Sequence, residues 1–271
     1  MQSAVLLLKL LNVPQSVIHL AMGTNHKALE DLDKRLCKLR KDVVEKEEKN
    51  IVFGNQKTWV DIEADEATFD KRDISQDPAL QHLVVKKNET IMWEQWGGVI
   101  QRGRPRTLVL RKLVPKLTVK RAPGPGAIRK TEWSSIANEL LLDRKVILHT
   151  DSAKSYKTKV RGVLHDKVVH CKKRVKVNGK FKWLNPKYVG VVTHKIPGTQ
   201  KTLKVKSGTQ IIDRVWSFLK DRIAMNQHCK AGSSLLRGKL RSAQYEYWFK
   251  NQDLWLACGD LCTENLRKFY K

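Results

Sequence analysis

The sequence predicts an α/β fold in which a mixed sheet is flanked by helices and preceded by a small all-α module. Apolar residues recur at helical spacing over residues 3–40, the period changes to two from Thr58, and predicted strands then alternate with helices. A chain of 271 residues is long enough for one medium domain and a smaller one. We therefore expect a helical module over residues 1–50, an α/β domain over residues 58–230 and a helical extension over residues 231–271.

The first module is predicted to contain three helices, over residues 3–11, 15–22 and 26–39. The last two are joined by a turn that contains Gly23 and Asn25, which is the signature of a helix-turn-helix. In that interpretation His26 and Lys27, which begin the third helix, would contact DNA. A plain three-helix bundle gives the same pattern and stays open. The apolar run at residues 4–11 is too short to cross a bilayer, so we expect a buried helix and no membrane partner.

The α/β domain is predicted from alternating and apolar segments. Residues 58–64 alternate as a strand does and run into Asp65, where we expect that strand to end. Residues 91–100 and 107–114 read as a hairpin around a basic turn. Residues 145–150 are almost continuously apolar, as a central strand requires, and Asp151 follows them. Amphipathic helices are expected at residues 132–142, 209–224 and 235–255.

Positive charge is concentrated in the second part of the chain. The formal net charge is +26, of which residues 1–80 contribute −2 and residues 81–271 contribute +28. From Lys154 to Lys206 there are sixteen Lys or Arg residues and one acid, Asp166. A surplus of this size indicates a polyanionic partner, with nucleic acid as the first candidate and an acidic membrane surface as the second. A solvated lysine-rich surface is the alternative without a partner.

The five cysteines are scattered and contain no CxxC motif, so the sequence predicts no disulfide framework and no zinc ribbon. A metal site of His228, Cys229, Cys258 and Cys262 is a minor alternative to two half-buried thiols on a helix.

Three aspartates are candidate metal ligands because ligand sites in α/β sheets gather at strand ends. Asp65 and Asp151 follow predicted strands, and Asp213 lies on a helix next to a basic segment. Cleaving or rejoining a phosphodiester is efficient with two Mg²⁺ ions, which carboxylates hold. Each aspartate could instead have a purely structural role, as a helix cap or as a surface charge. Asp213, for example, could pair with Lys220.

Several ordered motifs resemble those of Merlin-type DDE transposases and their bacterial insertion-sequence relatives. Residues 149–156 resemble an HTD-x-x-x-x-Y element that carries Asp151. Residues 209–220 are similar to a T-N-x-I-E-x-x-W-x-x-L-K helix that carries Asp213. The strand of Asp65, the Trp96-Gly97-Gly98 hairpin and the aromatic helix near Tyr245 are also similar, in consistent order over residues 58–250.

This resemblance implies an RNase H-like fold and a three-carboxylate site of Asp65, Asp151 and Asp213 that binds two Mg²⁺ or Mn²⁺ ions. It implies a DNA transposase that cleaves double-stranded DNA and transfers the cut strand, as a homodimer or higher assembly. We expect its location to be the nucleus in a eukaryote and the nucleoid otherwise. DNA phosphates would be held by basic side chains at Lys154, Lys157, Lys172, Lys173, Arg174 and Lys220.

The third acid departs from the family pattern, because Asp213 stands where the family usually has Glu. A catalytically inactive, domesticated DNA-binding protein derived from a transposase is therefore the alternative. A basic RNA-binding or ribosome-associated protein would explain the charge, but it would not explain the positions of the acids.

Overall fold

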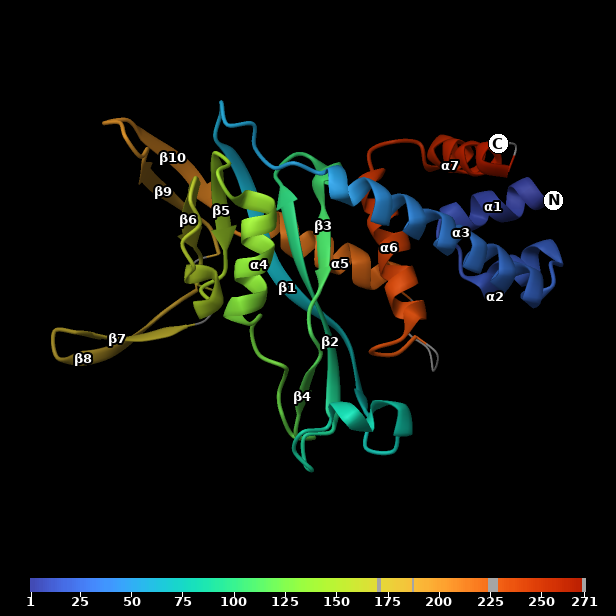
Figure 1. Ribbon diagram of the computed structural model, residues 1–271, viewed down its shortest axis with the longest axis horizontal. Coiled ribbons are helices and arrows are strands. Elements are labelled where there is room, and N and C mark those ends of the chain that lie inside the picture. The colour runs from blue at the N-terminus through green and yellow to red at the C-terminus, as the bar shows by residue number, and fades with distance from the viewer. Residues whose placement is uncertain (170–171, 187, 224–228, 270–271) are drawn as a thin grey trace. The chain divides into compact units, whose positions relative to one another are not determined.

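The computed structural model describes residues 1–169, 172–186, 188–223 and 229–269. The chain divides into two compact units (Figure 1). One unit is Val52–Trp216, and the other combines Met1–Ile51 with Ser217–Lys271. From the sequence we separate residues 58–230 from 231–271, whereas the two units divide at Trp216, inside a helix.

The helical unit contains a small apolar centre built by its first three helices. Val5, Ile18 and Leu29 form this centre, one residue from each of α1, α2 and α3. Gly23 ends α2 with a left-handed φ of 59°, and the Asn25 side chain accepts a hydrogen bond from the Lys27 N–H at 2.8 Å. These helices confirm the predicted elements, although α1 is buried on one side only. The helices of the unit are α1 (Gln2–Leu10), α2 (Gln15–Met22), α3 (His26–Glu47), α6 (Ser234–Trp248) and α7 (Leu254–Phe269).

Two predicted helix boundaries in this unit were wrong. Helix α3 continues beyond residue 39 to Glu47, because Arg40 and Val44 are buried and Arg40 forms an ion pair with Glu246 of α6. The segment at 235–255 is two helices, because α6 ends at Trp248 and a new helix starts at Leu254. The Asp253 carboxylate caps that start by accepting the Trp255 N–H at 2.8 Å.

A mixed six-stranded sheet forms the centre of the other unit, in the order β3-β2-β1-β5-β6 with β4 paired to β2. Strands β1 to β3 are antiparallel neighbours, whereas β5 runs parallel to both β1 and β6. The predicted α/β class with a mixed sheet is confirmed at this level (Figure 1). The strands are β1 (Val60–Asp73), β2 (Ile91–Gln101), β3 (Val109–Lys112), β4 (Lys116–Thr118), β5 (Val146–Thr150) and β6 (Val163–Lys167).

The first strand does not end at Asp65, as we expected, but continues to Asp73. It pairs with β2 from Ile62 opposite Gln101 to Asp73 opposite Ile91, with a bulge between Thr68 and Asp70. The backbone hydrogen bonds to β2 keep this polar stretch extended although its own side-chain pattern is weak. Asp65 therefore lies inside a strand, opposite Gly98 of β2.

Two helices cover opposite faces of the sheet at β2. A Cβ added to Gly97 would meet Ile136 of α4 (Lys130–Leu141), and one added to Gly98 would meet Trp216 of α5 (Gln210–Arg222). Because neighbouring residues of a strand point to opposite faces, α4 and the first part of α5 lie on different sides. The predicted helix end at Ala224 lies outside the described residues.

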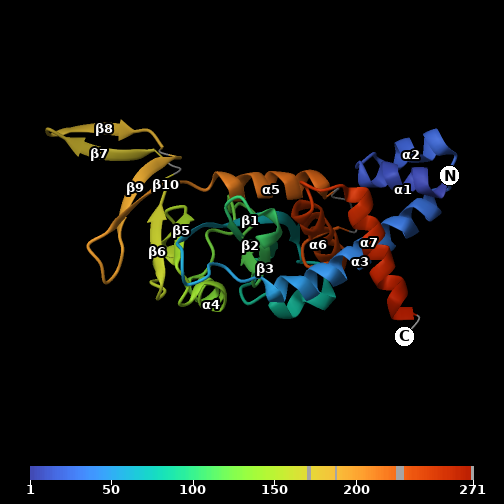
Figure 2. The ribbon, with the colours of Figure 1, turned by 90° about the horizontal axis from the view of Figure 1, so that it is seen from above.

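Between β6 and α5 the chain makes two hairpins, each a two-stranded sheet separate from the main sheet. One hairpin pairs β7 (Lys173–Val177) with β8 (Lys180–Leu184), and the other pairs β9 (Gly190–Lys195) with β10 (Thr202–Ser207). Figure 2 shows β7 and β8 beyond β9 and β10, at the end of this excursion.

No helix in the described part of the chain is both long enough and apolar enough to cross a membrane.

Candidate active site

Asp65 lies on β1 with little counter-charge around it. Its carboxylate oxygen Oδ2 accepts a hydrogen bond from the Trp216 indole N–H at 3.0 Å. Burial raises the pKa of Asp65 to about 8, and the negative charges of Glu66 and Asp151 add to this rise. Within the described residues, no Lys, Arg or His side chain forms an ion pair with Asp65. Asp65 therefore carries a perturbed carboxyl group of the kind that gathers at functional sites.

Asp151 follows β5, as predicted, and lies beside the strand of Asp65. The parallel register of β1 and β5 pairs Glu63 with His149, so Asp65 and Asp151 each come two residues further along adjacent strands. Asp151 turns the chain after β5, because its Oδ1 accepts the Ala153 N–H at 2.8 Å. The carboxylate is half-buried and raises the pKa of Asp65 by its charge. Two of the three predicted aspartates are thus electrostatic neighbours.

Glu66 is a further carboxylate near this pair that the sequence analysis did not single out. Its side chain accepts hydrogen bonds from the Tyr156 hydroxyl and from the Ile128 N–H, the latter at 3.0 Å. Burial raises the pKa of Glu66, and the charge of Asp151 contributes to the rise. The adjacent acids at positions 65 and 66 are visible in the sequence. Neighbouring residues of a strand point to opposite faces, however, so the sequence gives no reason to assign both to one site.

The start of α5 is bound to β1 by Glu63, two residues before Asp65. The Glu63 Oε2 atom accepts the N–H groups of Ile211 and Ile212 at 2.7 and 2.9 Å, which satisfies donors of the first turn. Arg102 completes this anchor, because its Nε donates to Glu63 at 2.7 Å and its Nη2 donates to the Gly208 carbonyl at 2.9 Å. The anchor fixes where α5 begins relative to β1.

Trp216 brings α5 against the strand pair that carries Asp65. A Cβ on Gly98 would lie 2.5 Å from Cη2 of Trp216, so only glycine permits this approach. Trp216 packs in the core, with an exposed fraction of 5%. Asp213 lies three residues before Trp216 in the first turn of α5, which is a neighbouring position on the helix surface. It is exposed, and it accepts a hydrogen bond from the Thr209 hydroxyl at 3.3 Å.

The side-chain chemistry of these acids favours binding of a divalent metal ion, whereas their arrangement does not form a complete metal site. Carboxylate oxygens suit Mg²⁺ and Mn²⁺, and a bound cation would favour the ionised form of Asp65, which burial and the neighbouring acids disfavour. Among the residues that the structure describes, however, no group of three or more His, Cys, Asp or Glu side chains is arranged to hold a metal ion. Asp65 and Asp151 fit a shared cation by charge, and Asp213 is not gathered with them. His228 of the alternative cysteine site lies outside the described residues.

A second acidic cluster lies earlier on β1 and is neutralised internally. His149 is fully buried; its Nδ1 contacts Asp166 at 2.9 Å and its Nε2 contacts Asp61 at 2.8 Å. Burial lowers the pKa of His149, but the hydrogen bonds to the two carboxylates outweigh this effect, and the pKa is raised. His194 of β9 also contacts Asp166, at 3.1 Å. Both ring nitrogens of His149 are used, so a positioning role fits it better than catalysis.

The predicted DNA-contacting side chains are mostly exposed but are spread over both units. In the α/β unit Lys154, Lys157, Lys172 and Arg174 are exposed, whereas the side chain of Lys173 lies outside the described part. In the helical unit His26, Lys27 and Lys220 are exposed, and the rings of His19 and His26 stack at 3.8 Å.

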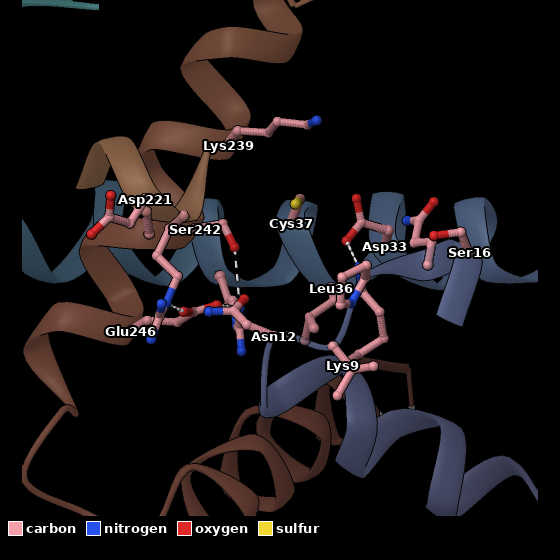
Figure 3. A pocket seen from close by; sticks show the side chains of 16 residues that line it. Lys9, Asn12, Ser16, Asp33, Leu36, Cys37, Asp221, Lys239, Ser242 and Glu246 are labelled. Atoms are coloured by element: carbon pink, nitrogen blue, oxygen red, sulfur yellow. Dashed lines mark hydrogen bonds and ion pairs between the residues drawn. The ribbon is translucent and has the colours of Figure 1, made fainter. Parts of the chain in front are cut away.

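The helical unit contains a polar cavity of about 680 Å³, drawn in Figure 3. Its charged side chains are largely paired within the unit. Lys9 forms an ion pair with Asp33 at 2.7 Å, and Glu246 forms ion pairs with both Arg40 and Arg222. None of the three candidate aspartates lines this cavity. It therefore belongs to the packing of α1, α3 and α6, and it carries no part of the candidate active site.

Comparison of the chain with family models, with curated proteins and with solved structures found no match.

Proposed function

We propose that the protein is a DNA transposase with an RNase H-like catalytic unit, which cleaves DNA and transfers strands with the help of divalent metal ions. The observation that carries the proposal is the electrostatic coupling of Asp65 and Asp151 on adjacent parallel strands. The antiparallel run β3-β2-β1 continued by parallel β5 and β6 is the sheet expected of an RNase H-like fold. The anchoring of α5 beside Asp65 supports the same proposal.

In this proposal Asp65 and Asp151 would hold the metal ions, and Asp213 on α5 would be the third carboxylate ligand. A pair of Mg²⁺ or Mn²⁺ ions, when bound, would supply Lewis-acid chemistry at the attacking water or 3′-hydroxyl and at the leaving oxygen. Trp216 orients Asp65 through its N–H, and Glu63 holds the helix that carries Asp213. Lys154 and Lys157, exposed just after Asp151, hold the DNA phosphates.

A nicking assay tests this proposal. Full-length protein is incubated with labelled duplex DNA taken from both sides of its own gene, with Mg²⁺ or Mn²⁺. We expect nicking that requires metal and is lost in Asp151→Asn and Asp65→Asn. The matched control is Glu139→Gln, which changes an exposed acid on α4 and should nick normally.

The second candidate function is DNA binding without catalysis. It is favoured because Asp65, Asp151 and Asp213, all described residues, do not form a three-ligand metal group. Metal-dependent stabilisation separates the two proposals. If the wild-type protein binds the metal, a free metal concentration of ten times Kd should raise its free energy of unfolding by about 1.4 kcal/mol. Asp151→Asn should abolish this gain. DNA binding with neither nicking nor metal stabilisation would establish the second function and overturn the first.

A further inference from the structure

We propose that one face of the β7–β8 hairpin is a binding surface for unpaired DNA bases. This inference deepens the proposed function and rests on it for the choice of DNA as the nucleic acid. We call this surface the Trp183 face, and it consists of Arg174, Lys176, Phe181 and Trp183. Strand register places them together, because Arg174 lies opposite Trp183 and Lys176 opposite Phe181, and directly opposed residues share a face.

The Trp183 face combines two large aromatic side chains with two cations in the open. Phe181 and Trp183 are each 62% exposed, which is unusual for side chains that favour burial. The Arg174 guanidinium lies over the Phe181 ring at 3.9 Å from its centroid. Aromatic rings stack on bases of any sequence, while neighbouring cations neutralise phosphates, and single-strand binding proteins use this pairing of groups.

Charge complementarity selects a polyanion as the occupant of this face. Residues 167–212 contain twelve Lys or Arg and no Asp or Glu, so the hairpin and its surroundings repel cations throughout. An apolar protein partner would leave Arg174 and Lys176 without counter-charge. A polynucleotide satisfies the cations and the rings together.

The hairpin is built to present this face at a distance from the main sheet. Asn178 and Gly179 both have positive φ, 49° and 78°, which forms the tight two-residue turn that matches strand twist. Within the described part of the chain its strands pair only with each other, and every residue of β8 is exposed. A lone two-stranded hairpin is marginal in water, so a ligand that covers one face would also order it.

Unpaired bases fit this face better than an intact duplex. In a duplex the bases are stacked on each other, and only groove edges and phosphates are available to a protein. A ring as open as Trp183 gains most from a base whose flat face is free. Such bases arise at the ends of DNA that has been cut or opened.

The test measures binding of a fluorescein-labelled oligothymidine and of a duplex of equal length. The protein is full-length Asp151→Asn in EDTA, so that neither cleavage nor metal is involved. Trp183→Leu should weaken oligothymidine binding about 5- to 100-fold, whereas Trp183→Phe should retain most of it. Arg174→Gln should reduce the slope of log affinity against log salt by about 0.7. Trp255→Leu on α7 and Lys34→Gln on α3 are exposed controls that should leave binding unchanged.

Three outcomes would overturn the inference. Equal binding by Trp183→Leu and wild type would show that the rings do not stack on bases. Tighter binding to the duplex than to oligothymidine, with the same loss in both Trp183 variants, would show groove binding by the ribbon. Weak binding of both DNAs with tight binding of anionic lipid vesicles would assign the face to a membrane surface. Absence of metal-dependent nicking with intact oligothymidine binding would overturn the proposed catalysis and leave the Trp183 face standing.

Discussion

Two acidic clusters on β1 differ in how their charge is balanced. At Asp61 the protein supplies its own counter-charge: hydrogen bonding and charge from His149, with the nearby Arg102, lower the pKa of that carboxyl. Four positions along the strand, at Asp65, burial and two further acids raise the pKa to about 8. The first cluster resembles a closed structural network, whereas at the second burial disfavours the ionised carboxyl of Asp65, and a bound cation would favour it. This contrast separates structural from functional acids more clearly than their spacing does.

The largest effect is expected from breaking the internally balanced cluster. Asp166→Ala removes the partner of both His149 and His194 and should lower the free energy of unfolding by about 3 kcal/mol, because it leaves buried polar groups unpaired. Urea denaturation of both proteins measures the loss.

The pH dependence of this loss follows from the two pKa directions. The pKa of Asp166 is lowered mainly because the hydrogen bond and charge of His149 outweigh burial, so its contribution disappears as the pH falls below about 4. The pKa of His149 is raised, so its contribution disappears as the pH rises above about 6.5. The gap between wild type and variant should therefore be widest between these values. A gap that stays constant from acid to alkaline pH would contradict the charged pairing.

A medium effect is expected where Trp216 approaches β2. Gly98→Ala would place a methyl group 2.5 Å from the Trp216 ring and should cost about 1–3 kcal/mol of unfolding free energy through overpacking. Gly97→Ala is the matched control, because its nearest neighbour lies at 3.6 Å on the opposite face. Chemical denaturation of both variants measures the difference. Equal stability of the two would mean that α5 does not depend on this close approach.

The effect expected at Asp65 is a change in the slope of stability with pH. Between about pH 4 and pH 8 the folded protein keeps a proton on Asp65 that the unfolded chain releases, so stability falls as pH rises. Asp65→Asn keeps an acceptor for the Trp216 N–H but cannot ionise. The variant should therefore lose stability less steeply, by up to about 1.4 kcal/mol per pH unit. Parallel stability curves for the two proteins would show that Asp65 ionises normally in the fold.

Much of the fold could be predicted from local patterns. The alternation before Asp65, the apolar run of β5 and the stripe of α5 each encode burial directly, and these elements were confirmed. The second half of β1 could not be predicted, since only its hydrogen bonds to β2 keep that polar stretch extended. The charged end of α3 is likewise helical because of a buried ion pair with a residue about 200 positions away.

The candidate site could be predicted in part. Asp65 and Asp151 come together because β1 and β5 are adjacent parallel strands whose register pairs Glu63 with His149. The sequence did not indicate which groups position α5. These are Glu63, Arg102 and Gly98, whose role appears only when the helix lies against β1. The position of Asp213 relative to the other two aspartates depends on side-chain contacts that no spacing encodes, and the assembled trio stays a prediction.

Arg102 also joins two places that are far apart along the chain. Its Nη1 and Nη2 bind the carbonyls of Lys206 and Gly208 at 2.5 and 2.9 Å, where the chain returns from both hairpins to α5. On the outgoing side, the Val168 N–H binds the Thr150 carbonyl at 3.0 Å. The β7–β8 and β9–β10 hairpins lie between these two contacts, and lengthening a connection whose ends are held costs little entropy. The β7–β8 hairpin could therefore be exchanged for a longer or shorter one while Asp65 and Asp151 keep their positions.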